Sequence, residues 1–235
     1  MTEHLSKRKM GARSIISLLL SLVVSPLALF LAAGTFNWRM GWISIALLYG
    51  GSILSRVIMA IINPDLVKER ATGMDAKDSK AFDRWLVPII GIFGPMLTFI
   101  IAGLNKRFGW LPEVNLPLEI AGVVGVILAF LITTWAMVVN RYFSSVVRIQ
   151  TDRHQRVIME GPYRIVRHPA YAGSVIGSIM MPFMLGSFWA VIPGILTSAA
   201  VFVRTVYEDR TLQAELPGYT EYIRKTPKKL IPGIW

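Results

Sequence analysis

The sequence contains no cysteine, which excludes disulfide bonds, thiolate nucleophiles and cysteine-based metal sites. Charged residues are also scarce: they make up 17% of the 235 residues, whereas soluble domains hold roughly 25%. No strand followed by a glycine-rich loop and a helix is found, so no Rossmann-type nucleotide site is expected. Histidine, aspartate and glutamate nowhere have the spacing of metal ligands, and no metal is expected either. Repeated halves of the kind that many transporters carry are absent as well.

Apolar residues, by contrast, are abundant and occur in long runs: 54% of the chain is hydrophobic. Four stretches come near or above the roughly 20 residues needed to cross a bilayer, namely Ile15–Phe36, Trp42–Ile62, Leu86–Leu104 and Ile120–Val139. The second carries one charge, Arg56, which we expect to snorkel to the interface; a role in lining a pocket is the alternative. The chain is therefore predicted to be a multi-spanning α-helical membrane protein.

The net charge of +11 is distributed unevenly between the segments that join the apolar stretches. Lysine and arginine number four before the first stretch, then one, five, two and six in the successive connecting segments. This alternation follows the positive-inside pattern, so the N-terminus and the segments 63–85 and 140–171 are predicted to be cytoplasmic. The basic excess suits an anionic inner leaflet, and no nucleic-acid partner is expected.

The stretch Gly173–Val203 runs for 31 residues without a charge and is interrupted by prolines and by Gly186-Ser187. A single straight helix of this length would measure about 46 Å, more than the roughly 30 Å of a hydrocarbon core. We therefore predict a hairpin of two short helices that turns near Gly186-Ser187. The turn would return Arg204 and the C-terminus to the cytoplasmic side, beside His168.

Polar side chains are concentrated in two short segments that this hairpin would bring together. The first, Gly161–Gly173, holds three cations or potential cations and two tyrosines. The second begins at Arg204, which shares a helix face with Glu208 because the two are four residues apart. Taken singly, such residues are also typical of interfacial anchors, including snorkelling arginines and an aromatic belt. Their convergence at one depth of a membrane favours a binding site, because polar groups are costly there.

These two segments resemble the isoprenylcysteine carboxyl methyltransferase family, and more broadly the integral-membrane methyltransferases that include phospholipid N-methyltransferases. The shared pattern consists of Gly161-Pro162-Tyr163, the string Arg167-His168-Pro169-Ala170-Tyr171-Ala172-Gly173, and an Arg-x-x-x-Glu step beyond the apolar hairpin. The resemblance covers residues 140–235. Two positions depart from it: Gln155, with His154 beside it, stands where family members often have histidine, and the acidic pair is Glu208-Asp209 rather than two glutamates.

The resemblance implies S-adenosylmethionine as methyl donor, bound at the cytoplasmic mouth of the helices. Carried over position by position, Arg204 would engage the acceptor's carboxylate. The cofactor contacts would be Gln155, Arg156, Val157, Ile158, Tyr163, His168, Pro169, Ala170, Tyr171 and Glu208. The implied acceptor is an isoprenylcysteine, or another isoprenoid or lipid carboxylate, which would enter from the surrounding membrane lipids. A carboxylate needs no general base near pH 7; a lipid amine, the alternative acceptor, would need one, supplied by Glu208 or Asp209.

The predicted fold is an all-α integral membrane protein with four full transmembrane helices, a shorter C-terminal helical hairpin and both termini in the cytoplasm. Residues 1–139 would form the four-span region and residues 140–235 the catalytic region of one structural unit. The site would face the cytoplasm, at the plasma membrane of a bacterium or the endoplasmic reticulum of a eukaryote. The segment 63–85, with five acidic and five basic residues, is predicted to be an amphipathic surface segment or a lid.

Two other functions stay open. One is an NADPH-dependent membrane oxidoreductase of the sterol-reductase type, in which Arg148, Arg153 and Arg156 would bind the 2′-phosphate. The other is a membrane or transport protein without enzymatic activity.

Overall fold

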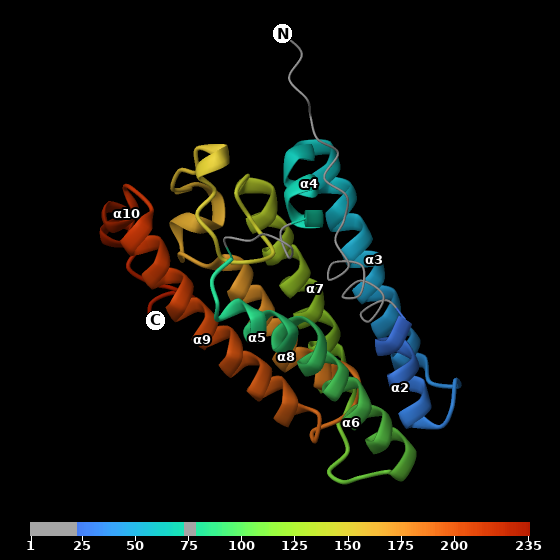
Figure 1. The fold of residues 1–235 in the computed structure, drawn as a ribbon. Helices are drawn as coiled ribbons and strands as arrows, with labels where there is room; N and C mark the ends of the chain where they lie inside the picture. Colours follow the sequence, from blue (N-terminus) through green and yellow to red (C-terminus); the bar gives the residue numbers. More distant parts are fainter. Residues whose placement is uncertain (1–22, 73–78) are drawn as a thin grey trace.

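The computed structural model describes residues 23–72 and 79–235 (Figure 1). Within these ranges the secondary structure is helical, apart from an isolated antiparallel bridge between Glu113 and Ser187. Four of the described helices are long and apolar enough to cross a membrane. They are α3 (Arg39–Ile62), the continuous run Asp83–Phe108, α7 (Leu116–Val139) and α9 (Val191–Glu215). The run Asp83–Phe108 consists of α5 (Asp83–Pro88), a π-helical turn η3 (Ile89–Phe93) and α6 (Gly94–Phe108). The all-α class is thus confirmed.

Three of the predicted spans, Trp42–Ile62, Leu86–Leu104 and Ile120–Val139, are confirmed as parts of long helices, and α9 is a further long helix. The first predicted span, Ile15–Phe36, lies largely outside the described residues, and its described part contains α2 (Ser25–Ala33), which packs against α6. The fourth long helix is α9, which was predicted to be half of a hairpin of two short helices. It is long because no residue breaks it where the apolar stretch ends, and it continues from Val203 through Arg204 to Glu215.

The partner of α9 is α8 (Pro169–Met184), which is shorter, with 16 residues. Proline stands at its first position, where the missing N–H costs nothing. The chain turns between the two helices at Gly186, whose φ of 70° is a left-handed conformation that glycine adopts without steric cost. Helices α8 and α9 then pack against each other.

The polar segments gather at one end of the helices. Figure 1 shows α4 (Pro64–Thr72), the connection 140–168 and α10 (Tyr219–Lys225) at the end opposite to the turns that join α2 to α3, α6 to α7 and α8 to α9. The connection contains two short 3-10 turns, η4 (Thr151–Arg153) and η5 (Gly161–Arg164). The segments with many cations therefore share one end, as the charge pattern requires; that this end is cytoplasmic stays a prediction.

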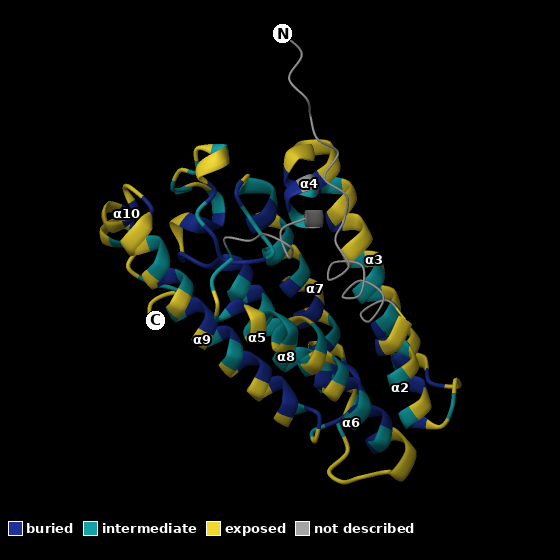
Figure 2. Ribbon diagram, in the orientation of Figure 1, coloured by how far each residue is buried: buried dark blue, intermediate teal, exposed yellow. Residues whose placement is uncertain are grey.

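Large apolar side chains cover the outer faces of the helices. Ile61 of α3 is 77% exposed, Leu131 of α7 61% and Leu196 of α9 62%, and Figure 2 shows exposed residues along the outward sides of these helices. Such surfaces suit hydrocarbon better than water.

Helix α8 lies very close to α7, and the glycine of the predicted motif permits this. A Cβ atom added to Gly173 would stand 2.9 Å from the backbone oxygen of Ala129, closer than real Cβ atoms come. Gly173 is thus a packing residue. It holds the first turns of α8, and with them Tyr171, against α7.

Candidate active site

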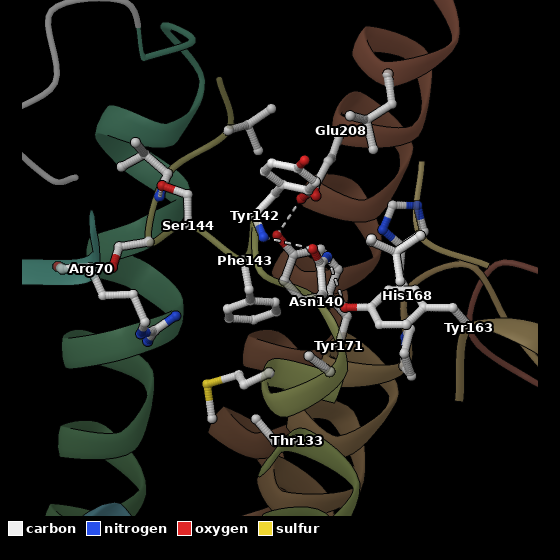
Figure 3. Close-up of a pocket in the computed structure, with 18 of the residues that line it drawn as sticks. Arg70, Thr133, Asn140, Tyr142, Phe143, Ser144, Tyr163, His168, Tyr171 and Glu208 are labelled. Carbon is white, nitrogen blue, oxygen red and sulfur yellow. Dashed lines mark hydrogen bonds between the residues drawn. The ribbon is translucent and has the colours of Figure 1, made fainter. Parts of the chain in front are cut away.

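A cavity of about 590 Å³ opens between the polar connection 140–158, the start of α8, the second half of α9, and helices α3, α4 and α7 (Figure 3). Its volume lies within the range of small-molecule sites. Every residue proposed for the site from the sequence lines it: Gln155, Arg156, Val157, Ile158, Tyr163, His168, Pro169, Ala170, Tyr171, Arg204 and Glu208. The structure therefore brings all eleven together; the role of each stays a prediction.

The centre of the cavity is built around Tyr171. Its hydroxyl donates a hydrogen bond to Oε2 of Glu208 (Figure 3), and the guanidinium of Arg204 lies over its ring at 5.3 Å from the centroid. The ring of His168 stacks beside it, with centroids 5.8 Å apart. These contacts join the start of α8 to α9 and fix the orientation of Glu208 toward the cavity.

Arg204 shares a helix face with Glu208, but its carboxylate partner is Asp83. Arg204 donates from Nε to Asp83 Oδ1 at 2.8 Å and from Nη2 to Oδ2 at 3.0 Å, and Nη2 also reaches the carbonyl of Ser145 at 3.1 Å. Asp83, 3% exposed, begins α5 and also accepts from the backbone N–H of Val147. Sequence reasoning missed Asp83, because nothing local distinguishes it from the other acids of segment 63–85.

Asp209 lies behind the cavity and organises its wall. It accepts from Arg167 Nε at 2.8 Å and Nη2 at 2.9 Å, from the Tyr219 hydroxyl at 2.8 Å, and lies 3.1 Å from Nε2 of His168. Burial and the negative charge of Asp209 raise the pKa of Tyr219, so its phenol stays protonated and keeps donating. The interpretation of Arg167 as a snorkelling anchor is wrong, since this side chain is buried, whereas Arg164 is exposed.

The two ends of the connection 140–158 are also tied into the wall. Tyr163 is buried, and its hydroxyl accepts from Asn140 Nδ2 at 3.1 Å. Gln155 lines the cavity, and its Oε1 accepts from the backbone N–H of Gln150 at 2.7 Å. His154, the neighbour that could have replaced Gln155 in the alignment, is exposed and has a left-handed φ of 50°. Of these two neighbours, Gln155 is the one that lines the cavity, and its role there stays a prediction.

The arginines proposed for an NADPH phosphate are largely engaged by the protein itself. Arg148 donates from Nε and Nη2 to the two carboxylate oxygens of Glu69 at 3.1 and 3.0 Å, and it also contacts Asp152. Arg153 donates to Gln150 Oε1 at 2.7 Å. Only Arg156 has no bonding partner among the described residues. The structure gives this alternative no support.

Helix α4 contributes to the cavity as well, which the sequence did not indicate. Leu66 is fully buried, Glu69 is 9% exposed, and Val67 and Arg70 line the cavity. The part of segment 63–85 that forms α4 thus has exposed residues, such as Pro64 and Asp65, and a buried face that forms part of the cavity wall.

A second cavity, of about 280 Å³, lies deeper among the helices and is lined almost entirely by apolar groups. It extends between α3, α6, α7, α8 and α9, where Val126, Ala129 and Met181 belong to its wall. Ile90, Phe130, Thr133 and Ser174 line both cavities, so the two are adjacent. The arrangement offers a polar chamber beside an apolar one.

Comparison with known proteins shows which family this part of the chain resembles. Residues 121–214 match the sequence model of the isoprenylcysteine carboxyl methyltransferase (ICMT) family. Residues 121–214 are thus similar to the isoprenylcysteine carboxyl methyltransferase family. The match contains the start of α8, Arg204 and Glu208, so the resemblance recognised in the motif residues is confirmed. Together with the long apolar helices, this match points to a multi-pass membrane protein that is similar to methyltransferases.

Two curated relatives are similar over part of the chain. The cobalt-zinc-cadmium resistance protein CzcN of Cupriavidus metallidurans is 29% identical over 158 residues, which are 63% of this chain and 67% of that protein. Protein-S-isoprenylcysteine O-methyltransferase B of Arabidopsis thaliana is 27% identical over 124 residues, which are 52% of this chain and 60% of the plant protein.

Proposed function

We propose that this protein is an S-adenosylmethionine-dependent methyltransferase that esterifies the carboxylate of a lipid-tailed acceptor at the boundary between membrane and cytoplasm. The observation that carries the proposal is the adjacency of the two cavities. The polar one holds the ICMT-family residues, and the apolar one lies at the depth of the long helices.

The residues of the polar cavity fit the cofactor. Glu208 uses Oε2 to accept from Tyr171, and its Oε1 has no hydrogen-bond partner among the described residues, so it is available to an ammonium group or to ribose hydroxyls. Val157, Ile158 and Ala170 add apolar surface for an adenine ring. When bound, S-adenosylmethionine would supply an electrophilic methyl group on a sulfonium that becomes a neutral thioether.

The apolar cavity suits the tail of an isoprenoid or another lipid. Its wall is mainly apolar, with a few serine and threonine side chains among the apolar ones, and burying each CH₂ of a tail there would contribute about 0.8 kcal/mol. An acceptor with its tail in this cavity would present its head group past Phe130 and Thr133, the residues shared with the polar cavity.

The chemical demands on the protein are then modest. A carboxylate is already nucleophilic near pH 7, so the protein has to align the reactants and exclude water rather than remove a proton. Tyr171 and Arg204 are held by Glu208 and Asp83, so neither needs to reorganise when ligands bind. Such preorganisation supports an in-line transfer.

The test is calorimetric titration of the detergent-solubilised protein with S-adenosylhomocysteine, with NADPH as the parallel ligand. We expect saturable binding of S-adenosylhomocysteine and a loss of about 1–3 kcal/mol in Glu208→Gln. Glu221→Gln is the matched control, because Glu221 is an exposed glutamate of α10 that pairs only with Lys225.

Binding of NADPH but not of S-adenosylhomocysteine would instead support the reductase alternative. Failure of both ligands to bind would refute the proposed function. If S-adenosylhomocysteine bound equally to Glu208→Gln and to the wild type, the assignment of Glu208 would be wrong.

A further inference from the structure

Arg70, in the wall of the cavity, has no carboxylate partner among the described residues. Arg70 of α4 lines the cavity, and its Nη1 is buried without a hydrogen-bond partner among the residues that the structure describes. The guanidinium carbon lies 5.1 Å from the centroid of the Phe143 ring, which is a cation–π contact. An aromatic face contributes about 0.5–2 kcal/mol but does not neutralise a charge.

The other arginines of the cavity differ from Arg70. Arg148, Arg167 and Arg204 each donate two hydrogen bonds to one carboxylate, those of Glu69, Asp209 and Asp83. Arg56 and Arg156 are exposed. Within the described part of the chain, Arg70 alone combines a buried nitrogen with the lack of a carboxylate partner.

Arg70 nevertheless stays charged at neutral pH. Its burial, together with the nearby cations Arg56 and Arg204, lowers the pKa of Arg70 to about 10, which is still well above 7. A buried guanidinium that keeps its charge is costly unless an anion neutralises it. An anionic group bound next to Arg70 in the cavity would therefore be stabilised by this charge.

The position of Arg70 indicates which ligand brings this anion. Figure 3 shows Arg70 on the side of the cavity opposite to His168 and Tyr163, with Phe143 in between. Met59 of α3, which also lines the cavity, packs in one cluster with Leu66 of α4 and Phe143, and Phe130 and Thr133 line both this cavity and the apolar one. An acceptor whose tail occupies the apolar cavity would reach Arg70 with its head group.

We propose that Arg70 binds the carboxylate of the acceptor and supplies the net positive charge that selects it. Arg204, whose charge is balanced by Asp83, then positions Tyr171 and offers at most Nη1 as a further donor. This inference rests on the proposed function.

The chemistry of the transfer gives this residue a second consequence. One carboxylate oxygen of the acceptor forms the new bond to the methyl carbon, the carbon–sulfur bond breaks, and its electron pair stays on sulfur. No proton is released, and the product is an uncharged ester. Arg70 therefore attracts the substrate more strongly than the product, which favours release of the ester.

The experiment compares the binding of N-acetyl-S-farnesyl-L-cysteine and of its methyl ester to the full-length protein saturated with S-adenosylhomocysteine. We expect the wild type to prefer the acid by about 10- to 100-fold. In Arg70→Gln this ratio should fall to near 1 because affinity for the acid is lost while affinity for the ester is kept. Arg70→Lys should keep part of the preference, and Arg224→Gln, a change at an exposed arginine of α10, should keep all of it.

Titration of each variant with S-adenosylhomocysteine distinguishes the possible failures. If the wild type does not bind it, the proposed function fails. If Arg70→Gln alone loses it while Arg70→Lys keeps it, Arg70 serves the cofactor's carboxylate and our assignment is wrong. An acid-to-ester ratio that is the same in Arg70→Gln and the wild type, or near 1 in the wild type, would also overturn the assignment.

Discussion

Two arginines line the same cavity in opposite electrostatic surroundings. Arg204 of α9 is 8% exposed and is held at two nitrogens by the buried carboxylate of Asp83. Arg70 of α4 has a buried nitrogen without a partner among the described residues. The guanidinium of Arg204 is therefore neutralised by a neighbouring carboxylate, whereas that of Arg70 has no such partner among the described residues. Under our proposal, the positive charge that a ligand meets comes from Arg70 rather than from Arg204, although Arg204 lies against the motif residue Tyr171.

The largest effect on stability should come from removing the carboxylate that pairs with Arg204, because Arg204 would then lack a counter-charge as Arg70 does. In Asp83→Asn, the buried Arg204 loses its counter-charge, and we expect a loss of about 3–5 kcal/mol in the free energy of unfolding. Thermal unfolding in detergent measures this. The double variant Asp83→Asn/Arg204→Gln should recover much of the loss. If its loss instead equalled the sum of the losses in the two single variants, the two residues would not stabilise each other.

A smaller loss of stability should follow from displacing α8, the helix that carries Tyr171, without changing any charge. Gly173→Val places a side chain against the backbone of Ala129, and overpacking of this kind costs about 1–3 kcal/mol. The thermal midpoint should fall, and binding of S-adenosylhomocysteine should weaken because α8 carries cavity residues. The control is Gly50→Ala, because a Cβ added to Gly50 meets no atom within 4 Å. Gly109→Ala is not suitable, because the φ of Gly109 is 62°, a left-handed conformation that alanine adopts only with strain.

Removing the charge of Arg70 should not lower the free energy of unfolding, in contrast to the two changes above. Arg70→Gln relieves the cost of a buried guanidinium, so the ligand-free protein should be equally stable or gain about 1 kcal/mol. The measurement is thermal unfolding without ligands, beside the wild type. A clear destabilisation would mean that Arg70 has a structural anion partner in the folded protein.

The smallest effect should come from an exposed pair near the same wall. Lys80 and Glu215 form an ion pair at 2.6 Å, but their side chains are 31% and 46% exposed. Glu215→Gln should change stability by less than about 1 kcal/mol, with the effect shrinking further at high salt. A loss as large as that of Asp83→Asn would indicate that the pair anchors the segment before α5 more strongly than its exposure suggests.

Much of the candidate site was accessible from the sequence because it depends on local features. The motif around His168 and the four-residue step from Arg204 to Glu208 are local patterns. The apolar stretch between them is too long for one straight helix across a membrane, so a turn within it was predicted. Since both segments return to the same end of the helices, their convergence follows from the lengths of the helices alone. All the residues chosen in this way line one cavity.

Other parts could not be predicted, because they depend on the rotation and packing of helices that are distant in sequence. Asp83 and Arg204 are 121 positions apart, and Glu69 and Arg148 are 79 apart. Each helical residue turns the side-chain direction by about 100°, so a small change in packing would exchange one partner for another. The roles of the two acids of the pair Glu208-Asp209 were separable only in three dimensions, where one lines the cavity and the other holds its wall.

By itself, the sequence determined the helical class, the apolar stretches and the end of the molecule at which the polar segments meet, since hydropathy and helical periodicity are properties of neighbouring residues. Tertiary structure decided which arginines of the cavity pair with a carboxylate and which one has no such partner among the described residues. That choice depends on distances of about 3 Å between atoms of different helices, and only the packed fold sets such distances.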